Sequence, residues 1–453
     1  EGTSTSLTLG GFVQDSWSLF DKVTLNVGGR YDTQTLWGLD GKMGLNLPNQ
    51  WSPRLGLIYD FTQQGRSKLY VNYARFYENV PLDMADLSFP QQRLLSTTLN
   101  APCNPSDPAA LAPGGACNVD GNRRVIGNPE SPSQYWNAEG GDRVPVDPNI
   151  RAQSSDEFVV GGEYEIIVGR LGLSYTKRYL NNVIEDMSRD DGSTFFLGNP
   201  GKGTSSDFPL ARRDYDAVNV YYTKAFANSW LAQVSYTWST LRGNYSGLFR
   251  ADTGQLSPNL TRDFDLLSLT VNRDGPLPGD RTHAFKAFGA KEFRVTKNLS
   301  VDVGGGYRAR SGAPLNFLGY HPRRSGAETF ILPRGSAGRL PWVHNLDGHV
   351  GLNQRLAGNY TLSVTLDVFN LFNFQQVTDV DQVFTYTRVL PLEQGEKPGN
   401  VTSCREAGNA ECLVRTSATG NALIAPTDIN PNFKQPIAYQ SPRSVRFGVK
   451  LSF

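Results

Sequence analysis

The chain has 453 residues, of which 39% are hydrophobic, and a formal net charge of +1 at pH 7. No stretch approaches the roughly eighteen consecutive apolar residues of a membrane-spanning helix, and no basic run favours nucleic-acid binding. A membrane β-barrel remains compatible with this composition, because only alternate residues of its strands face lipid, and 46 glycines and 27 prolines favour strands and turns over helices.

Stretches in which apolar and polar residues alternate recur along the chain. Around residue 25, Leu25 and Val27 alternate with Asn26 and Gly28, which gives a strand one apolar and one polar face. This pattern predicts thirteen strands, near residues 5–19, 23–38, 51–62, 67–81, 153–167, 170–189, 211–226, 230–249, 281–294, 299–318, 340–355, 360–380 and 436–453.

The connections between these predicted strands alternate in length. Short ones lie near 21–22, 63–65, 168–169, 227–229, 295–298 and 357–359, and the intervening ones are long, above all 82–152 and 381–435. Short turns on one rim and long loops on the other predict an outer-membrane barrel with its turns in the periplasm. A soluble β-sandwich is the alternative, but it gives no reason for this segregation and its strands usually have about five or six residues.

The odd number of strands has a topological consequence. If the last strand runs toward the periplasm, alternation makes the first strand run the same way, so the two ends of the wall cannot pair antiparallel. The rest of the barrel must then supply an odd number of strands. We therefore expect Glu1 to be an internal start, consistent with the lack of an initiator methionine or signal peptide.

The chain ends in a strand pattern that stops on an aromatic residue. Residues 444–453 alternate without a break, with Phe447, Val449, Leu451 and Phe453 on the apolar face. An aromatic final residue at the end of such a strand resembles the closing strand of bacterial outer-membrane barrels. We expect these four residues to act as the signal read by the barrel-insertion machinery.

Three motifs make the resemblance specific. They are the FVQDSW segment at 12–17 with the strand that follows it, the SPRLGLIYD segment at 52–60, and the DVFNLFN segment at 367–373. Together these motifs resemble those of TonB-dependent outer-membrane transporters, and their sequences are most similar to the branch often called Oar-like receptors.

This resemblance implies an all-β fold, a transmembrane antiparallel β-barrel of twenty-two strands filled by an N-terminal plug. Residues 1–453 would then be the C-terminal thirteen strands, with the plug and nine strands lying upstream. It implies TonB-dependent active transport of a large or scarce substrate across the bacterial outer membrane, with no cofactor. A passive channel, a surface adhesin and a soluble secreted binding protein are the alternatives.

The partners that follow are the N-terminal part of the same barrel with its plug, TonB through an upstream box, outer-membrane lipid and lipopolysaccharide, the barrel-insertion machinery and an unidentified substrate. No nucleic acid is expected.

Charged residues on the polar faces of the predicted strands are expected to face the lumen, because a basic residue facing lipid at the bilayer midplane costs roughly 2–4 kcal/mol. We expect them to contact the plug or each other more than the substrate. These residues are Arg30, Asp32, Arg54, Asp60, Asp302, Arg308, Asp367, Arg446 and Lys450.

The outer loops are the expected substrate-binding surface, near residues 82–152, 190–210, 250–280, 319–339 and 381–435. Candidate contacts within them are Arg123, Arg124, Tyr135 and Trp136.

Four cysteines form two close pairs within loop sequences. We predict disulfides between Cys103 and Cys117 and between Cys404 and Cys412, formed in an oxidising compartment. Free surface thiols are the alternative, and zinc is disfavoured because no histidine lies near either pair in the sequence.

No catalytic or metal-binding pattern points to an enzyme. The four histidines are scattered along the chain without metal-ligand spacing. Asp263 and Asp265, and likewise Asp190 and Asp191, are expected to be solvated loop acids, with calcium binding as the alternative reading.

Overall fold

The computed structural model describes residues 3–89, 94–99, 134–139, 143–190, 192–249, 260–321, 326–356, 360–389, 391, 414–417, 420–423 and 429–453. The chain divides into two compact units. The first comprises Glu1–Thr8, Gln34–Asn46 and Val80–Pro145, and the second comprises Leu9–Thr33, Leu47–Asn79 and Val146–Phe453.

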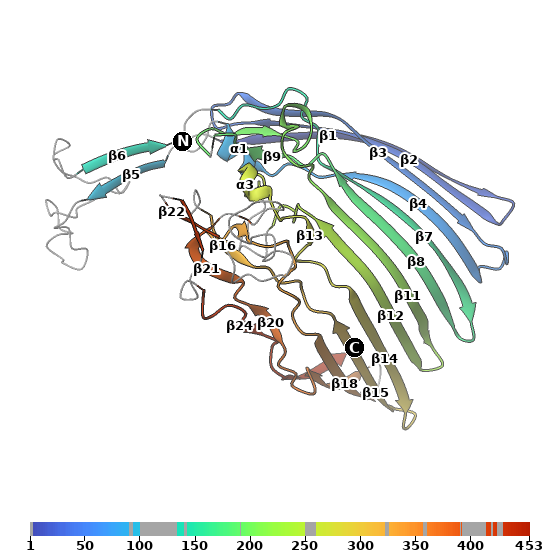
Figure 1. Ribbon diagram of the computed structural model, residues 1–453. Coiled ribbons are helices and arrows are strands. Elements are labelled where there is room, and N and C mark those ends of the chain that lie inside the picture. Colours follow the sequence, from blue (N-terminus) through green and yellow to red (C-terminus); the bar gives the residue numbers. More distant parts are fainter. Residues whose placement is uncertain are drawn as a thin grey trace. The chain divides into compact units, whose positions relative to one another are not determined.

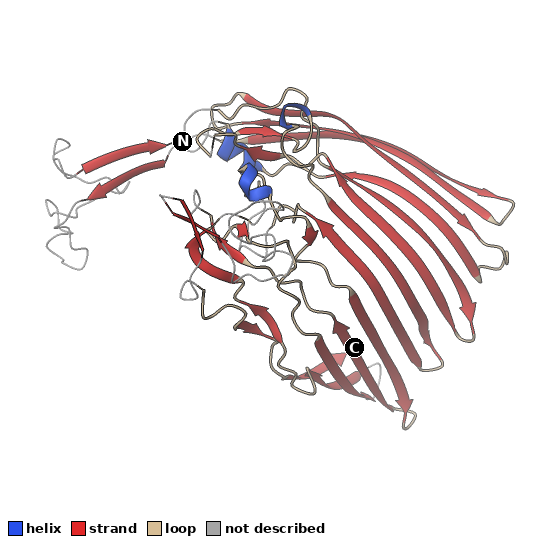
Figure 2. Cartoon of the chain, in the orientation of Figure 1, coloured by secondary structure: helices blue, strands red, loops and turns tan. Residues whose placement is uncertain are grey.

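Strands dominate the described residues (Figure 2). One antiparallel sheet contains thirteen strands on a continuous path, in chain order, and β13 (Gly275–Pro276) pairs with β12 beside it. The thirteen are β1 (Thr5–Leu19), β2 (Val23–Trp37), β3 (Met43–Tyr59), β4 (Ser67–Tyr77), β7 (Ser154–Ile166), β8 (Gly169–Asn181), β11 (Arg213–Ala227), β12 (Trp230–Gly243), β14 (His283–Arg294), β15 (Leu299–Arg310), β18 (Val343–Arg355), β19 (Thr361–Phe369) and β25 (Ser444–Ser452).

The thirteen-strand prediction is confirmed, and the ends of the path are β1 and β25. Each strand is followed on the path by its successor in this set, and no pairing among the described residues joins β25 back to β1. The sheet is therefore open.

Short turns join alternate strands at one end of the second unit, as the turn from β14 to β15 illustrates (Figure 1). The turns from β7 to β8 and from β11 to β12 contain two residues each. Ala227 pairs with Trp230, and Asn228 and Ser229 both have positive φ, 55° and 62°. Two positive-φ residues form a type I′ turn, whose twist matches that of the flanking strands.

The opposite ends of the strands carry longer connections with structure of their own. They hold β9 (Glu185–Met187), β10 (Phe196–Gly198), η1 (Gly203–Ser205), α3 (Leu267–Thr270), β16 (Leu318–Tyr320), β17 (Thr329–Phe330), β20 (Val377–Val380), β21 (Val383–Arg388), β22 (Val414–Ser417), β23 (Gly420–Leu423) and β24 (Pro436–Tyr439). The predicted strands at 170–189, 299–318 and 360–380 are therefore too long, because β8, β15 and β19 end earlier.

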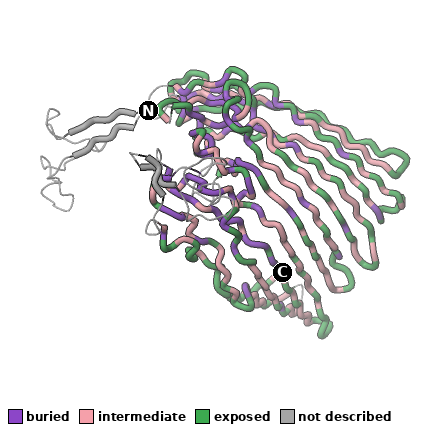
Figure 3. Tube along the Cα trace, viewed as in Figure 1, coloured by how far each residue is buried: buried purple, intermediate pink, exposed green. Residues whose placement is uncertain are grey.

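The buried apolar clusters of the second unit lie in these connections and not along the sheet. One cluster gathers Met187, Phe208, Tyr245 and Phe264 with smaller neighbours, and another is built on Ile331. In Figure 3 the long strands are mainly exposed or intermediate in burial. The loops thus fold around cores of their own.

The first unit contains α1 (Leu82–Ser88) and the hairpin of β5 (Leu94–Leu99) with β6 (Gln134–Glu139). The buried amide of Gln34 donates to the Val80 carbonyl and accepts from the Val80 backbone N–H, at 3.0 and 2.9 Å. Arg143 pairs with Asp40 at 2.5 Å and lies over the Phe89 ring. These contacts fix α1 beside the strand residues of that unit.

Candidate functional site

The strand register gives the sheet of the second unit one apolar and one polar face. Leu352, Val364 and Val449 lie directly opposite one another on β18, β19 and β25, and they are 46%, 40% and 76% exposed. Such a row of exposed apolar side chains suits lipid. His349 of β18 and Asp367 of β19 are also directly opposite each other, and they occupy the other face of the sheet.

His349 links two carboxylates across three strands of the polar face. Its Nε2 lies 2.8 Å from Oδ2 of Asp302 on β15, and its Nδ1 lies 2.6 Å from Oδ1 of Asp367 on β19. Arg446 of β25 continues the row, with its Nη2 2.9 Å from the second oxygen of Asp367. We call Asp302, His349, Asp367 and Arg446 the wall ladder.

A second ion pair lies nearer the loop end of the same face. Nη2 of Arg308 lies 2.7 Å from Asp347, which also accepts hydrogen bonds from Nδ2 of Asn345 and from the backbone N–H of Asn370, at 2.7 and 2.9 Å. Arg308 itself is exposed. The wall therefore satisfies its carboxylates while it leaves guanidinium surface open.

Arg30 and Asp32 pair along one strand, β2, through two hydrogen bonds of 2.7 Å. Gly10 of β1 makes room for them, because a Cβ at that position would lie 2.0 Å from Oδ1 of Asp32. A side chain there would displace the carboxylate, so this pair depends on the glycine.

Arg54 lies over the Phe76 ring at 5.7 Å and lines a hollow of about 540 Å³ with Gln14, Asn26 and Asn72. This hollow lies on the polar face of β1 to β4. Lys450 of β25 lies on the polar face as well, opposite Ser363.

Asp60 differs from the expectation. It follows β3 in the short turn to β4, where it accepts hydrogen bonds from the hydroxyls of Ser67 and Thr62, at 2.6 Å each, and from the Gly65 backbone N–H at 2.7 Å. These hydrogen bonds hold the pKa of Asp60 well below its usual range. Its carboxylate stabilises the turn.

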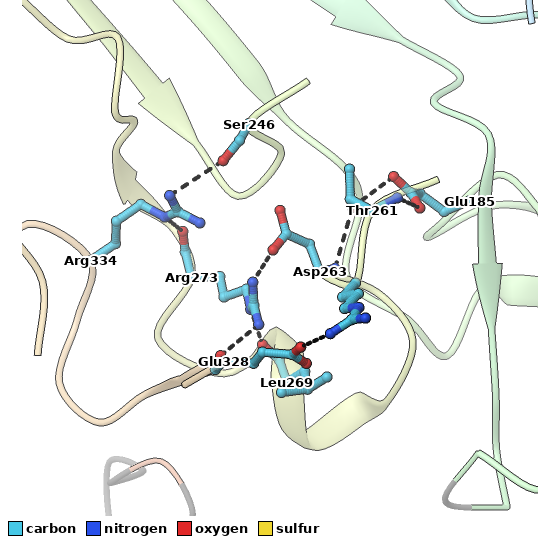
Figure 4. Close-up of polar contacts among 9 residues, drawn as sticks. Glu185, Ser246, Thr261, Asp263, Leu269, Arg273, Glu328 and Arg334 are labelled. Atoms are coloured by element: carbon cyan, nitrogen blue, oxygen red, sulfur yellow. Dashed lines mark hydrogen bonds and ion pairs between the residues drawn. The ribbon is translucent and has the colours of Figure 1, made fainter. Parts of the chain in front are cut away.

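A buried polar cluster joins three of the outer loops (Figure 4). Arg273, which is 1% exposed, pairs with the fully buried Asp263 and donates to the Glu328 carbonyl at 2.7 Å. Arg262 pairs with the Glu328 carboxylate at 2.6 Å. We call Glu185, Thr261, Asp263, Arg273, Glu328 and Arg334 the loop cluster.

The expectation that Asp263 and Asp265 are solvated is wrong, because both are buried. The physical reason for Asp263 is its ion pair with Arg273, a residue ten positions later in the same loop. Asp190 is exposed as expected and accepts hydrogen bonds from Thr194, whereas Asp191 lies outside the described residues.

Glu185 anchors the cluster to the loop after β8. Its two carboxylate oxygens accept from the backbone N–H and the hydroxyl of Thr261, both at 2.8 Å. Complete burial raises the pKa of Glu185 well above its ordinary value, and the nearby charge of Asp186 adds to this effect.

No group of His, Cys, Asp or Glu side chains within the described ranges has the arrangement of a metal site. None of the described helices has the length and apolar character needed to cross a membrane.

Comparison with known proteins identifies the family. The profile described as "TonB dependent receptor-like, beta-barrel" matches residues 1–371. The TonB-dependent transporter Oar of Myxococcus xanthus is 48% identical over 99% of the chain. The chain belongs to the TonB-dependent receptor family. It spans 43% of the length of that Myxococcus relative.

Two solved structures are similar at low sequence identity. The FrpB iron transporter of Neisseria meningitidis is 15% identical with a TM-score of 0.47, over 82% of this chain and 42% of that one. The ferric-catecholate import receptor Fiu of E. coli K12 is 12% identical with a TM-score of 0.45, over 84% and 42%.

Membership of the TonB-dependent receptors confirms the predicted β-barrel fold and an outer-membrane location, and it gives a family of receptors and transporters instead of enzymes. In such a barrel an apolar strand face suits lipid and a polar face suits the lumen, so the assignment of the wall ladder to the lumen side stays a prediction.

Several predicted residues of this TonB-dependent receptor lie outside the described residues, namely Arg123, Arg124, Cys103, Cys117, Cys404 and Cys412. Tyr135 and Trp136 belong to β6, and their backbones pair with Thr98 and Thr97 of β5. Sequence reasoning missed the role of His349. The connection between β18 and β19 is short, and the length of such a connection determines which residues of the two strands lie opposite each other, so this was the sequence feature that could have indicated the pairing of His349 with Asp367.

Proposed function

We propose that the protein containing this chain is an active transporter, in which TonB supplies the force that moves a large or scarce substrate across the outer membrane. This chain would form the C-terminal wall and its outer loops. Family membership carries the proposal, since the chain is 48% identical to a TonB-dependent transporter over 99% of its length.

The polar wall supports a plugged lumen. The side chains of Arg308 and Arg446 are 63% and 69% exposed on the lumen face although each already contacts a carboxylate. A plug would find hydrogen-bonding partners there. Polar contacts of this kind are individually weak in the presence of water, so a pulling force can exchange them for water more readily than it can open a dry apolar interface.

The open sheet supports our division of the protein into this thirteen-strand segment and an upstream segment that completes the barrel. β1 and β25 run in the same direction, so a segment that closes the barrel must supply an odd number of strands. We propose nine strands, which together with these thirteen give twenty-two, and an upstream plug with a TonB box. A structure of the full-length protein that contains an even number of additional strands would refute this division.

The proposed partners follow from this assignment. They are the plug, TonB, outer-membrane lipid and lipopolysaccharide, the insertion machinery that reads the strand ending at Phe453, and a substrate that enters between the outer loops.

The experiment is a comparison of transport with and without TonB. Cells that produce the full-length protein, in strains with and without TonB, are incubated in the same medium, and solutes and proteins gained or lost are measured by mass spectrometry. We expect at least one substance to change only when both the protein and TonB are present. A variant without the TonB box, assembled to the same level, is the matched control.

Other outcomes identify the alternatives. Transport that is unchanged without TonB, together with steady ion conductance through the purified protein, would identify a passive channel. Loss of cell attachment in the absence of the protein, with no change in transport, would identify an adhesin.

A further inference from the structure

A hollow of about 870 Å³ lies on the lumen face of the second unit. Its wall is formed by β14, β15, β18, β19 and β25, and its side by residues of the last outer loop, including Thr378 of β20 and Tyr439 of β24. Basic side chains line it, namely Arg281, Lys286, Arg308 and Arg310. We call it the basic hollow.

The basic hollow lies toward the loop end of the wall. The turn from β14 to β15 is at residues 295–298, whereas Lys286 and Arg308 lie opposite each other far from that turn. Arg310 is the last residue of β15 before the long connection. A solute that arrives from the side of the outer loops would therefore meet these charges early.

The positive charge of the hollow is only partly compensated. Asp347 is its acidic lining residue, and it is already engaged by Arg308, Asn345 and the Asn370 backbone. Asp280, next in sequence to Arg281, pairs with Arg339. Within the part of the chain that the structure describes, Lys286, Arg310 and Arg281 form no salt bridge.

Arg281 has an unusual environment for a guanidinium. Its Nη1 is buried and has no hydrogen-bond partner among the described residues. Burial, together with the positive charges of Arg310 and Arg339, lowers the pKa of Arg281. A buried donor without a partner and a set of mutually repelling cations are both stabilised by a bound anion.

The dimensions and chemistry of the hollow define the occupant. Its volume is that of a site for a small molecule. Guanidinium groups pair with carboxylate and phosphate oxygens in bidentate geometry, and the hydrogen bonds are strengthened by charge. We propose that the basic hollow binds a small multivalent anion that carries carboxylate or phosphate groups, as the cargo or as a part of it.

This inference rests on the proposed function, because it names the chemistry of what enters the lumen. The two are separable by experiment. Anion binding is measured at equilibrium without TonB, whereas transport requires it, so one result can fail while the other holds.

The test uses the full-length protein, purified in detergent, with citrate and inorganic pyrophosphate as separate probes in isothermal titration at low salt. The variant combines Lys286→Gln with Arg310→Gln. The control combines Lys450→Gln with Arg355→Gln, which removes the same charge from lumen-facing positions outside the hollow. Heat modifiability on gels verifies that all three proteins are folded.

We expect the intact protein to bind at least one probe, the variant to lose roughly tenfold or more in affinity, and the control to change by less than about twofold. A preference for citrate would identify carboxylate groups as the ligand chemistry, and a preference for pyrophosphate would identify phosphate groups. Absence of binding by the intact protein, or an equal loss in variant and control, would overturn the proposal. A variant that only lowers thermal stability, with no probe bound by the intact protein, would instead assign the charges to contacts with the plug.

Discussion

Asp367 on β19 lies 2.6 Å from His349 on β18, and the two residues are directly opposite in the strand register. The same histidine reaches Asp302 on β15, and the same aspartate reaches Arg446 on β25. One imidazole and one carboxylate thus tie together four strands at the end of the sheet, where β25 is the last strand of the path.

Replacement of Asp367 by asparagine should weaken this end of the wall. The neutral amide retains the shape but loses the charge that both His349 and Arg446 contact. We expect the full-length protein to unfold at a lower urea concentration. Thr365→Val, on the same face one pair along β19 and opposite Gly448, is the control. An equal shift in both proteins would contradict a specific role of the ladder.

Replacement of Asp263 by alanine should open the loop cluster and leave the sheet intact. It removes the carboxylate of Asp263 from its buried ion pair with Arg273, and breaking a buried pair costs about 3–5 kcal/mol. We expect faster hydrogen exchange of backbone amides in residues 260–276, with unchanged exchange in β15. Asp274→Ala, which removes an exposed partner of Arg212, should leave both regions unchanged.

Glu185 should make the loop cluster sensitive to pH. Its folded-state pKa is raised, so the folded state holds a proton that the unfolded state releases, and stability falls as pH rises from the ordinary glutamate range through the raised pKa. Exchange of loop amides, corrected for intrinsic rates, should accelerate over that window. Glu185→Gln should remove this dependence, whereas Glu165→Gln at an exposed position should retain it.

Phe453 should matter for assembly more than for stability. Its side chain is 93% exposed, and its ring centroid is 6.4 Å from that of Tyr360. Deletion should reduce the amount of barrel in the outer membrane, while the assembled fraction melts at the normal temperature. Phe372→Ala, at another exposed aromatic position, should assemble normally. Equal yields of the truncated and intact proteins would argue against an insertion signal.

The cysteines should form two local crosslinks, Cys103 with Cys117 and Cys404 with Cys412. In the chain-entropy model a loop of about fifteen residues gains roughly 3 kcal/mol from such closure. Peptide mapping without reduction should recover both linked peptides. Free thiols, or a bond between the two pairs, would be the contrary result.

The sequence was sufficient to predict the strands of the wall, because the alternation of apolar and polar residues is a local property that long antiparallel strands preserve. Most strand starts and all thirteen positions agree with the structure. The strand ends were less predictable, because β8 gives way to β9 where loop packing, and not alternation, determines the backbone path.

The candidate site was harder to predict because it depends on contacts between strands and loops. That Arg308 pairs with Asp347, or that His349 lies between two aspartates, follows only from the register of three strands. Asp263 is buried in its ion pair with Arg273, and Arg273 in turn donates to the carbonyl of Glu328, 55 residues away. The chemistry of the individual residues therefore indicated which side chains are important, but it gave less information about which of them form pairs.

The hydrophobic clusters around Met187 and Ile331 lie in the outer connections, while the strands beneath them follow register and hydrogen-bond ladders. The loop cores and the strands are consequently under different selective constraints. We expect a substitution that reshapes a loop core to leave the strand pairing of the wall largely unchanged, and a change of charge on the polar strand face to leave the loop cores largely unchanged. We therefore expect that whole loop modules can be exchanged between relatives while the strand pairing of the wall is retained.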